Sequence, residues 1–299
     1  MKIGLFSIGA GRAAQPEIIV QLAQKAEEVG FESIFAPEHT VLFPAEAYTS
    51  VYPYSEDGKI SGLRREGDTD LLDPFLALTW AAAHTKTIRL GTGICLVPQR
   101  NPLITAKAVA SLDVLSGGRF IFGVGIGWLK EEFRALGIPP AHRAERTREY
   151  IQVMKTLWTE EHPQFAGQFC RFPPLKLHPK PVQRPHPPIL FGGESEPALR
   201  RSVEIGDGWL GFNVSVEKAA QAIQRLQALA AEVGRNFATL DISVSPYSTV
   251  PHMTLDTLKR YRDLGVQRVV LINTTNNPAR IDATLEDMGH TLVQPALAL

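Results

Sequence analysis

Short apolar runs alternate with longer segments of helical periodicity along the whole chain. A strand is predicted at Lys2–Phe6 and a helix at Pro16–Val29, whose apolar positions recur at spacings of three and four until Gly30 ends it. Further strands are predicted at Ser33–Ala36, Ile88–Val97, Phe120–Val124, Pro188–Phe191, Gly208–Phe212, Asp241–Ser245 and Arg268–Ile272. Further helices are predicted at Pro74–His84, Pro102–Leu115, Glu145–Trp158, Glu196–Ile205, Val216–Val233, Leu255–Leu264 and a closing C-terminal segment.

This pattern amounts to eight βα units, the number that closes an α/β barrel. Strands that are apolar along their whole length suit a parallel sheet covered by helices, and periodicity alone leaves a barrel and a doubly wound sheet open. Two segments interrupt the rhythm, Thr40–Leu72 after the second strand and Glu160–Pro187 before the fifth. Long insertions of this kind are either lids and binding loops or plain surface excursions.

The composition fits a globular protein with a single domain over residues 1–299. Lys and Arg together number 31, as do Asp and Glu, and no block of like charges occurs. A small-molecule partner is therefore expected rather than a nucleic acid. No apolar run reaches the ~20 residues of a membrane span, and the first residues lack the features of a secretory signal. Cys95 and Cys170 are far from a CxxC spacing, so free thiols in the cytoplasm are expected.

The informative positions of a barrel enzyme are those just after each strand, because the active site lies at that end. Glu38 and His39 follow the second predicted strand. A histidine titrates near neutral pH, so His39 suits proton transfer to or from a reacting oxygen. The alternative for such a short motif is a loop-capping histidine beside a surface carboxylate.

Glycines follow two other predicted strands. The step from Gly93 to Ile94 interrupts the third strand, which predicts either a barrel-corner bulge or a surface for a flat ligand. The fourth strand runs into a glycine-rich turn whose missing side chains let a planar cofactor or a phosphate approach backbone N–H groups. That turn comprises Gly125, Ile126, Gly127 and Trp128, the last either stacking on a ligand or packing.

A third glycine turn follows the fifth predicted strand. Gly192 and Gly193 precede a helix for which Ser195 is the expected N-cap, an arrangement that suits either a phosphate or a plain capped turn. The remaining histidines are scattered without metal-ligand spacing, so no metal is expected. No GxSxG elbow and no GxxxxGK[ST] loop occurs, which removes the usual sequence support for acyl or phosphoryl transfer.

Taken in order, these segments resemble the bacterial luciferase-like monooxygenase superfamily, especially its branch of coenzyme F420-dependent oxidoreductases. The resemblance covers roughly two thirds of the chain. It is carried by Ala23–Glu38, Arg89–Ile94, Asn101–Pro102, Leu112–Arg119 running into Gly123–Trp128, Pro179–Gly193 and Gly206–Trp209.

The resemblance implies a (β/α)₈ barrel with a flavin-like ring in its mouth. It implies that Gly93 and Ile94 form a backbone bulge behind the ring, often with a cis peptide, and that Gly125, Ile126 and Gly127 border the cofactor. It further places the cofactor phosphate at Gly192, Gly193 and Ser195, and the proton donor or base at His39, preceded by Glu38.

The expected activity is hydride transfer between coenzyme F420 and a small organic substrate. The alternative is an FMN-dependent monooxygenase that uses O₂ and reduced flavin from a partner reductase. A non-catalytic flavin-binding relative and a barrel isomerase or aldolase are further alternatives. Two positions depart from the family: Ile104 stands where FMN enzymes often carry arginine, and Trp128 where some F420 dehydrogenases carry glutamate. Dimers are common in the family, so a homodimer is also expected.

Overall fold

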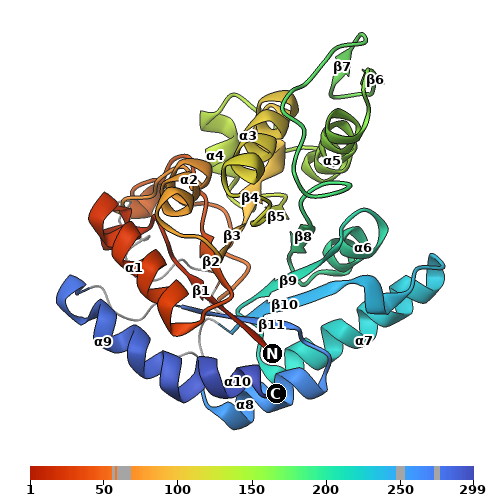
Figure 1. Cartoon of the computed structure of the whole chain (residues 1–299). Coiled ribbons are helices and arrows are strands. Elements are labelled where there is room, and N and C mark those ends of the chain that lie inside the picture. Colours follow the sequence, from red (N-terminus) through yellow and green to blue (C-terminus); the bar gives the residue numbers. More distant parts are fainter. Residues whose placement is uncertain (56–57, 59–68, 247–252, 273–276) are drawn as a thin grey trace.

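A computed structural model describes residues 1–55, 58, 69–246, 253–272 and 277–299. Eight parallel strands form a closed barrel in which β3 pairs with β5 and β11 pairs with β1 (Figure 1). The predicted (β/α)₈ barrel is therefore confirmed. The barrel strands are β1 (Lys2–Phe6), β2 (Ser33–Ala36), β3 (Arg89–Thr92), β5 (Phe120–Gly125), β8 (Ile189–Gly192), β9 (Gly208–Phe212), β10 (Asp241–Ser245) and β11 (Arg268–Ile272).

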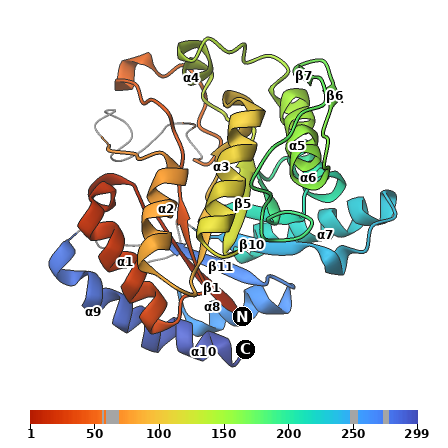
Figure 2. The ribbon, with the colours of Figure 1, turned by 45° about the horizontal axis from the view of Figure 1, so that its top comes forward.

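Helices cover the outside of the barrel, as Figures 1 and 2 show from two directions. Their starts follow from the sequence, because proline opens several of them and the side chains of Asp73 and Asn101 accept hydrogen bonds from the first free backbone N–H groups of α2 and α3. The helices are α1 (Pro16–Val29), α2 (Pro74–His84), α3 (Pro102–Leu115), α5 (Arg143–Thr159), α6 (Glu196–Glu204), α7 (Val216–Glu232), α8 (Leu255–Asp263), α9 (Pro278–Met288) and α10 (Gln294–Leu297). No helix in the described part of the chain is long and apolar enough to cross a membrane.

Three features differ from the sequence-based prediction. The strand expected at Ile88–Val97 is divided into β3 and a short β4 (Cys95–Leu96), which pairs with β5 only. An additional short helix, α4 (Lys130–Ala135), follows β5. The second insertion contains a small antiparallel hairpin, β6 (Phe165–Ala166) and β7 (Arg171–Phe172), which projects beside α5 (Figure 1).

The first insertion, Thr40–Leu72, includes residues 56–57 and 59–68, which lie outside the described residues. Its described parts lie at the carboxyl end of the barrel, where Tyr52 and Tyr54 line a cavity. This insertion therefore contributes to the walls of a binding site. The two cysteines, Cys95 and Cys170, are free thiols, as predicted.

The apolar interior has two parts. The larger lies between the strands and the surrounding helices, and the smaller fills the barrel itself. The second cluster is formed by side chains from six different strands, Phe6, Phe35, Ile121, Leu190, Leu210 and Val270. Because these side chains fill the barrel, its axis is not an open channel, and the cavity lies above them at the carboxyl ends of the strands.

The amino end of the barrel is closed by a buried ion pair network. The guanidinium of Arg268, on β11, is fully buried and donates to both carboxylate oxygens of Glu32 at 2.8 and 2.9 Å. It also donates to Asp241 at 3.0 Å and to the Ser243 hydroxyl at 2.8 Å. Burial disfavours the charge of Arg268, but these two carboxylates outweigh it and hold its pKa above the ordinary value.

We predict that Arg268→Met destabilises the protein by about 3–5 kcal/mol, because Glu32 and Asp241 would lose their common cation. Urea unfolding measures the change. The control is Arg260→Met, which removes an exposed guanidinium paired with Glu217 and should change the free energy of unfolding by less than about 1 kcal/mol. Equal effects of the two substitutions would contradict a structural role for the network.

Candidate active site

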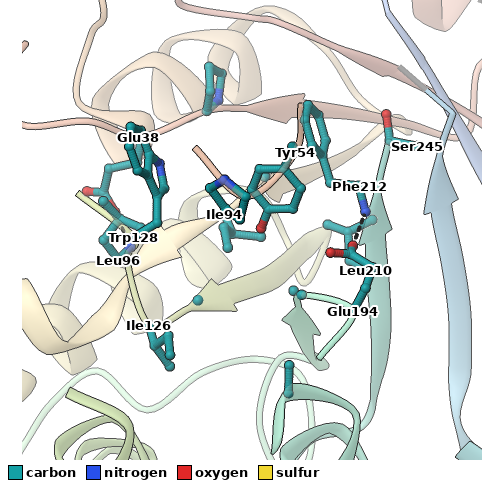
Figure 3. A pocket seen from close by; sticks show the side chains of 18 of the residues that line it. Glu38, Tyr54, Ile94, Leu96, Ile126, Trp128, Glu194, Leu210, Phe212 and Ser245 are labelled. Carbon is teal, nitrogen blue, oxygen red and sulfur yellow. Dashed lines mark hydrogen bonds between the residues drawn. The ribbon is translucent and has the colours of Figure 1, made fainter. Parts of the chain in front are cut away.

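A cavity of about 560 Å³ opens at the carboxyl ends of the barrel strands (Figure 3). It is of the size that proteins use for small molecules and cofactors. All of the site residues expected from the sequence line this one cavity, namely Glu38, His39, Gly93, Ile94, Gly125, Ile126, Gly127, Trp128, Gly192, Gly193 and Ser195. Strand ends that are far apart in the sequence are thus brought together.

The floor of the cavity is formed by the break between β3 and β4. The peptide bond between Gly93 and Ile94 is cis, as the family resemblance implied. The N–H of Gly93 donates to the carbonyl of Ala36 at 2.8 Å. The Ile94 side chain packs on the barrel cluster and contributes to the floor.

The glycines around Ile94 have a different role from the one expected. A Cβ atom at Gly125 would lie 2.0 Å from the Cδ1 atom of Ile94, and one at Gly192 would lie 2.9 Å from the same atom. Both positions therefore make room for Ile94. We expected the missing side chain at Gly125 to open the backbone to a ligand. That expectation is wrong, because the side chain of Ile94 occupies the space.

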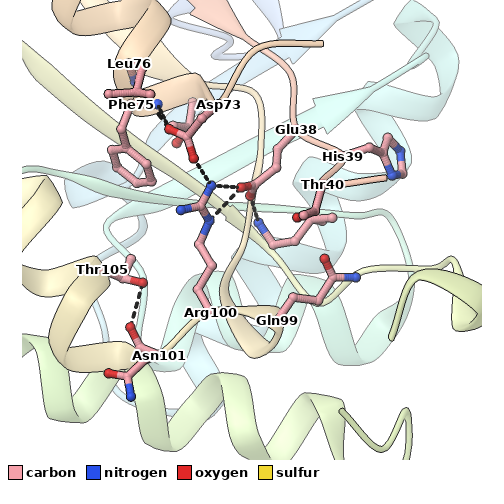
Figure 4. Close-up of polar contacts among 12 residues, drawn as sticks. Glu38, His39, Thr40, Asp73, Phe75, Leu76, Gln99, Arg100, Asn101 and Thr105 are labelled. Atoms are coloured by element: carbon pink, nitrogen blue, oxygen red, sulfur yellow. Dashed lines mark hydrogen bonds and ion pairs between the residues drawn. The ribbon is translucent and has the colours of Figure 1, made fainter. Parts of the chain in front are cut away.

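Glu38 is engaged in an ion pair away from His39 (Figure 4). One carboxylate oxygen accepts from Nε of Arg100 at 2.6 Å, and the other accepts from the N–H of Leu96 at 2.5 Å. Arg100 also donates to Asp73 at 2.6 Å. Burial raises the pKa of Glu38, and the Arg100 guanidinium opposes that rise. Glu38 thus holds β4 in place, and its carboxylate pairs with Leu96 and Arg100 rather than with the neighbouring His39.

His39 is paired instead with Glu132 of α4. Its Nδ1 lies 3.1 Å from Oε2 of Glu132, whose carboxylate is fully buried. The same carboxylate accepts from the N–H groups of Thr40 at 2.6 Å and Val41 at 3.3 Å, and from the amide of Gln99 at 3.1 Å. Burial disfavours ionisation of Glu132, but the hydrogen bonds, first among them the one from His39, hold its pKa below the ordinary value.

This pairing determines which ring nitrogen of His39 faces the carboxylate and which is left for a ligand. An ionised Glu132 accepts from Nδ1–H, which leaves Nε2 of neutral His39 as a hydrogen-bond acceptor. Within the described part of the chain, Nε2 has no protein partner, and the side chain lines the cavity. His39 can therefore take a proton from a bound molecule or return one.

Two arginines reach the cavity with unused donors. Arg201 of α6 is only 5% exposed, and Arg143 is the first residue of α5. The Nε atoms of both are buried without a hydrogen-bond partner in the described structure. Burial and the neighbouring charges of Arg148 and Arg143 lower the pKa of Arg201. Two adjacent guanidinium groups with free donors are suited to an anion.

The turn between β8 and α6 lies beside these arginines. Gly193 adopts a positive φ of 102°, and Ser195 occupies the N-cap position without making a side-chain capping bond. The expected place of Ser195 is thus confirmed, while its hydroxyl is left to the cavity. Between them, Glu194 accepts from the N–H of Phe212 at 2.8 Å, and burial raises the pKa of Glu194 to about 7.

The wall formed by the first insertion is fixed to α4 by Glu131. Its carboxylate accepts from the N–H and hydroxyl groups of both Thr49 and Ser50, at 2.7 Å for the N–H of Thr49 and 2.6 Å for the hydroxyl of Ser50. These bonds outweigh the effect of burial and lower the pKa of Glu131 to about 2. The segment that carries Tyr52 and Tyr54 is held in this way.

A family model described as luciferase-like monooxygenase matches residues 1–264 of the chain. The chain belongs to the luciferase-like monooxygenase family. An uncharacterised protein of Mycobacterium tuberculosis is 33% identical over 274 residues, which cover 90% of this chain and 91% of that protein.

Relatives with named cofactors fall into two groups. A putative coenzyme F420-dependent oxidoreductase of Mycobacterium tuberculosis is 31% identical over 228 residues, covering 70% of this chain and 55% of that protein. The FMNH₂-dependent dimethylsulfone monooxygenase of Pseudomonas putida is 39% identical over 137 residues, covering 45% and 38%. Luciferase-like enzymes are thus F420- or FMN-dependent oxidoreductases and monooxygenases, and this chain is an enzyme of that kind.

Solved structures support the luciferase-like fold over the full length. A monooxygenase from Streptomyces bottropensis superposes with a TM-score of 0.78 at 22% identity, covering 98% of this chain and 99% of that one. An F420-dependent secondary alcohol dehydrogenase superposes with a TM-score of 0.76 at 18% identity, covering 99% and 98%.

Sequence reasoning missed three charged residues of this luciferase-like site, Glu132, Arg143 and Arg201. Each lies on or at the start of a helix, in a stretch rich in charged residues, where burial of a single side chain has no local signal. The sequence signal that could have found Glu132 and Arg201 is their place on α4 and α6, the helices that directly follow the glycine turns. By contrast, Ile104 is 70% exposed on α3 and does not line the cavity, so its departure from the family pattern does not bear on this site.

We predict that Glu131→Gln loosens the luciferase-like barrel's first insertion, because an amide cannot replace a carboxylate that accepts four hydrogen bonds. Hydrogen exchange measures this as lower protection of the Thr49 and Ser50 amides. Since the pKa of Glu131 is lowered, its contribution in the wild type is fully present above about pH 4.5 and is lost as the pH falls through about 2. The control is Glu145→Gln on α5, and unchanged protection in Glu131→Gln would contradict the prediction.

Proposed function

We propose that the protein transfers a hydride between coenzyme F420 and a small organic alcohol or carbonyl compound. The observation that carries this proposal is the His39–Glu132 pair, a proton-transfer group placed in the cavity. The relative named as a putative coenzyme F420-dependent oxidoreductase, which matches 70% of the chain, supports the choice of cofactor.

The residues present fit a cofactor that carries a phosphate. The buried, unpartnered Nε atoms of Arg143 and Arg201 would hold the phosphate, together with the free hydroxyl of Ser195 and the N-terminal N–H groups of α6. Gly193 would let the phosphate approach the backbone. The ring would lie over the floor formed by Gly93 and Ile94.

When bound, F420 supplies the carbon that accepts or gives the hydride. The chain supplies the proton transfer. In the oxidation of an alcohol, Nε2 of His39 would accept the hydroxyl proton while the bound cofactor would take the hydride, and Glu132 would stabilise the resulting imidazolium. In the reverse direction His39 returns the proton to the carbonyl oxygen. Glu38 acts as a positioning residue in this proposal, because it holds β4 beneath the cavity.

A second candidate function is an FMN-dependent monooxygenase that inserts one oxygen atom of O₂ and receives reduced flavin from a partner reductase. The observation in its favour is the 39% identity to the FMNH₂-dependent dimethylsulfone monooxygenase over 137 residues. The pair of Arg143 and Arg201 suits the phosphate of either cofactor. Cofactor binding therefore separates the two candidates.

We predict that the purified protein binds F420 more tightly than oxidised or reduced FMN in calorimetric and fluorescence titrations. Arg201→Met should weaken cofactor binding by at least about tenfold, because one charged hydrogen bond to phosphate is lost. The control is Arg200→Met, whose guanidinium lies on the outer face of α6 in ion pairs with Glu232 and Glu196. Tight binding of reduced FMN would favour the monooxygenase instead, and binding of neither cofactor would refute both.

We predict that His39→Ala lowers turnover by about 10²-fold or more while leaving cofactor affinity nearly unchanged, as expected for loss of a general acid or base. Steady-state kinetics and cofactor titrations measure the two quantities. Glu132→Gln should lower turnover and shift its pH profile, because the imidazolium loses its carboxylate partner. Unchanged turnover of His39→Ala would remove His39 from the mechanism.

A further inference from the structure

A continuous band of aromatic rings runs along one wall of the cavity. It begins at His39, whose ring lies 6.1 Å from that of Trp128 in an edge-on contact. Trp128 contacts Tyr52 at 5.2 Å, and Tyr52 contacts Tyr54 at 5.5 Å. Tyr54 in turn contacts Phe212 at 5.2 Å. The band therefore starts at the proposed proton-transfer group and ends at β9.

The far end of the band is occupied by the carboxyl group of Glu194 (Figure 3). One of its oxygens accepts from the N–H of Phe212, and no ion pair to it is found among the described residues. The groups that act on it are Tyr54 from the first insertion and Lys218 from α7. Burial and the charge of Glu194 raise the pKa of Tyr54, which keeps that phenol neutral.

The positively charged side chains that line the cavity and the acidic ones near the aromatic band come from different elements. The arginines that line it in the described structure, Arg143 and Arg201, belong to α5 and α6 and are assigned to the cofactor phosphate by the proposed function. The band presents the uncharged rings of Trp128, Tyr52, Tyr54 and Phe212 between two acidic groups, Glu132 behind His39 and Glu194 beyond Phe212. The hydroxyl of Ser245, buried at the end of β10, also lines the cavity without a protein partner in the described part of the chain.

From this arrangement we propose that the substrate is an uncharged molecule, apolar apart from its reacting hydroxyl or carbonyl group, whose body lies on the aromatic band, and that Glu194 excludes carboxylates and phosphates. The proposal deepens the proposed function and rests on it for the place of the reacting group. Ser245 and neutral Glu194 can each donate a hydrogen bond to such a molecule.

Two physical effects act against an anion at this wall. An anion would lose its hydration among apolar ring faces without gaining a cation. It would also be repelled by ionised Glu194, which makes the repulsion dependent on pH. Because the pKa of Glu194 is about 7, discrimination against anions should be weak at pH 6 and strong at pH 8.

The experiment compares three probes of similar shape, cyclohexanone, cyclohexanecarboxylate and cyclohexylammonium. Each is titrated at pH 6 and pH 8 against the F420-loaded protein and against cofactor-free protein saturated with inorganic phosphate, so that Arg143 and Arg201 are occupied in both cases, with calorimetry as the readout. We expect cyclohexanone to bind at least about tenfold more tightly than the carboxylate at pH 8, with a smaller difference at pH 6. Glu194→Gln should tighten carboxylate binding at pH 8 by about tenfold and leave cyclohexanone within about twofold.

The matched control is Glu217→Gln, which changes the net charge equally on the exposed face of α7 and should leave all affinities unchanged. Carboxylate binding as tight as that of cyclohexanone, preference for the ammonium probe, absence of binding by all three, or loss of the pH dependence in the wild type would each overturn the proposal. These outcomes are distinct from failure of the proposed function. That failure would be seen as lack of F420 binding, whereas probe selectivity is also measured without the cofactor.

Discussion

The arrangement of the candidate active site depends on one fully buried carboxylate, that of Glu132. An unpaired charge in the interior is strongly unfavourable, so the fold must surround this group with donors. It does so with His39 and the two N–H groups after it, from the end of β2, and with Gln99 from the turn after β4. Two separate segments are thereby fixed to α4. The orientation of the His39 imidazole is a direct consequence of this compensation.

A second buried carboxylate, Glu38, fixes the floor beneath the same cavity. It joins β2 to β4 through Leu96 and Arg100, so that the chain leaves β3, passes Gly93 and Ile94, and re-enters the sheet beside β5. Glu38 and His39 are neighbours in the sequence, but their side chains have different partners and different roles. Glu38 holds the backbone on which a ring would rest, and His39 lines the cavity, where we propose that it exchanges a proton.

The barrel and the location of the site could be predicted from the sequence because both follow from local patterns. The signals are short-range: apolar strands, helix starts at proline, and glycine turns at strand ends. Every site residue expected from them lines one cavity. Glu131 and Glu132 show why the rest could not be predicted. They are neighbours in one helical turn, yet one accepts from Thr49 and Ser50 and the other from His39. Which direction each faces depends on segments about 80 to 90 residues away, and no local pattern contains that information.

The phosphate-binding residues proposed for the cavity do not distinguish the two candidate cofactors. The arginines that would bind phosphate suit either cofactor, and Ile104 lies outside the cavity, so neither feature separates them. The His39–Glu132 pair does bear on the choice. When a hydride leaves an alcohol carbon, the hydroxyl proton must leave as well, and a neutral imidazole oriented by a buried carboxylate is suited to accept it. The pairing at 3.1 Å therefore fits the proton transfer that the proposed hydride transfer needs.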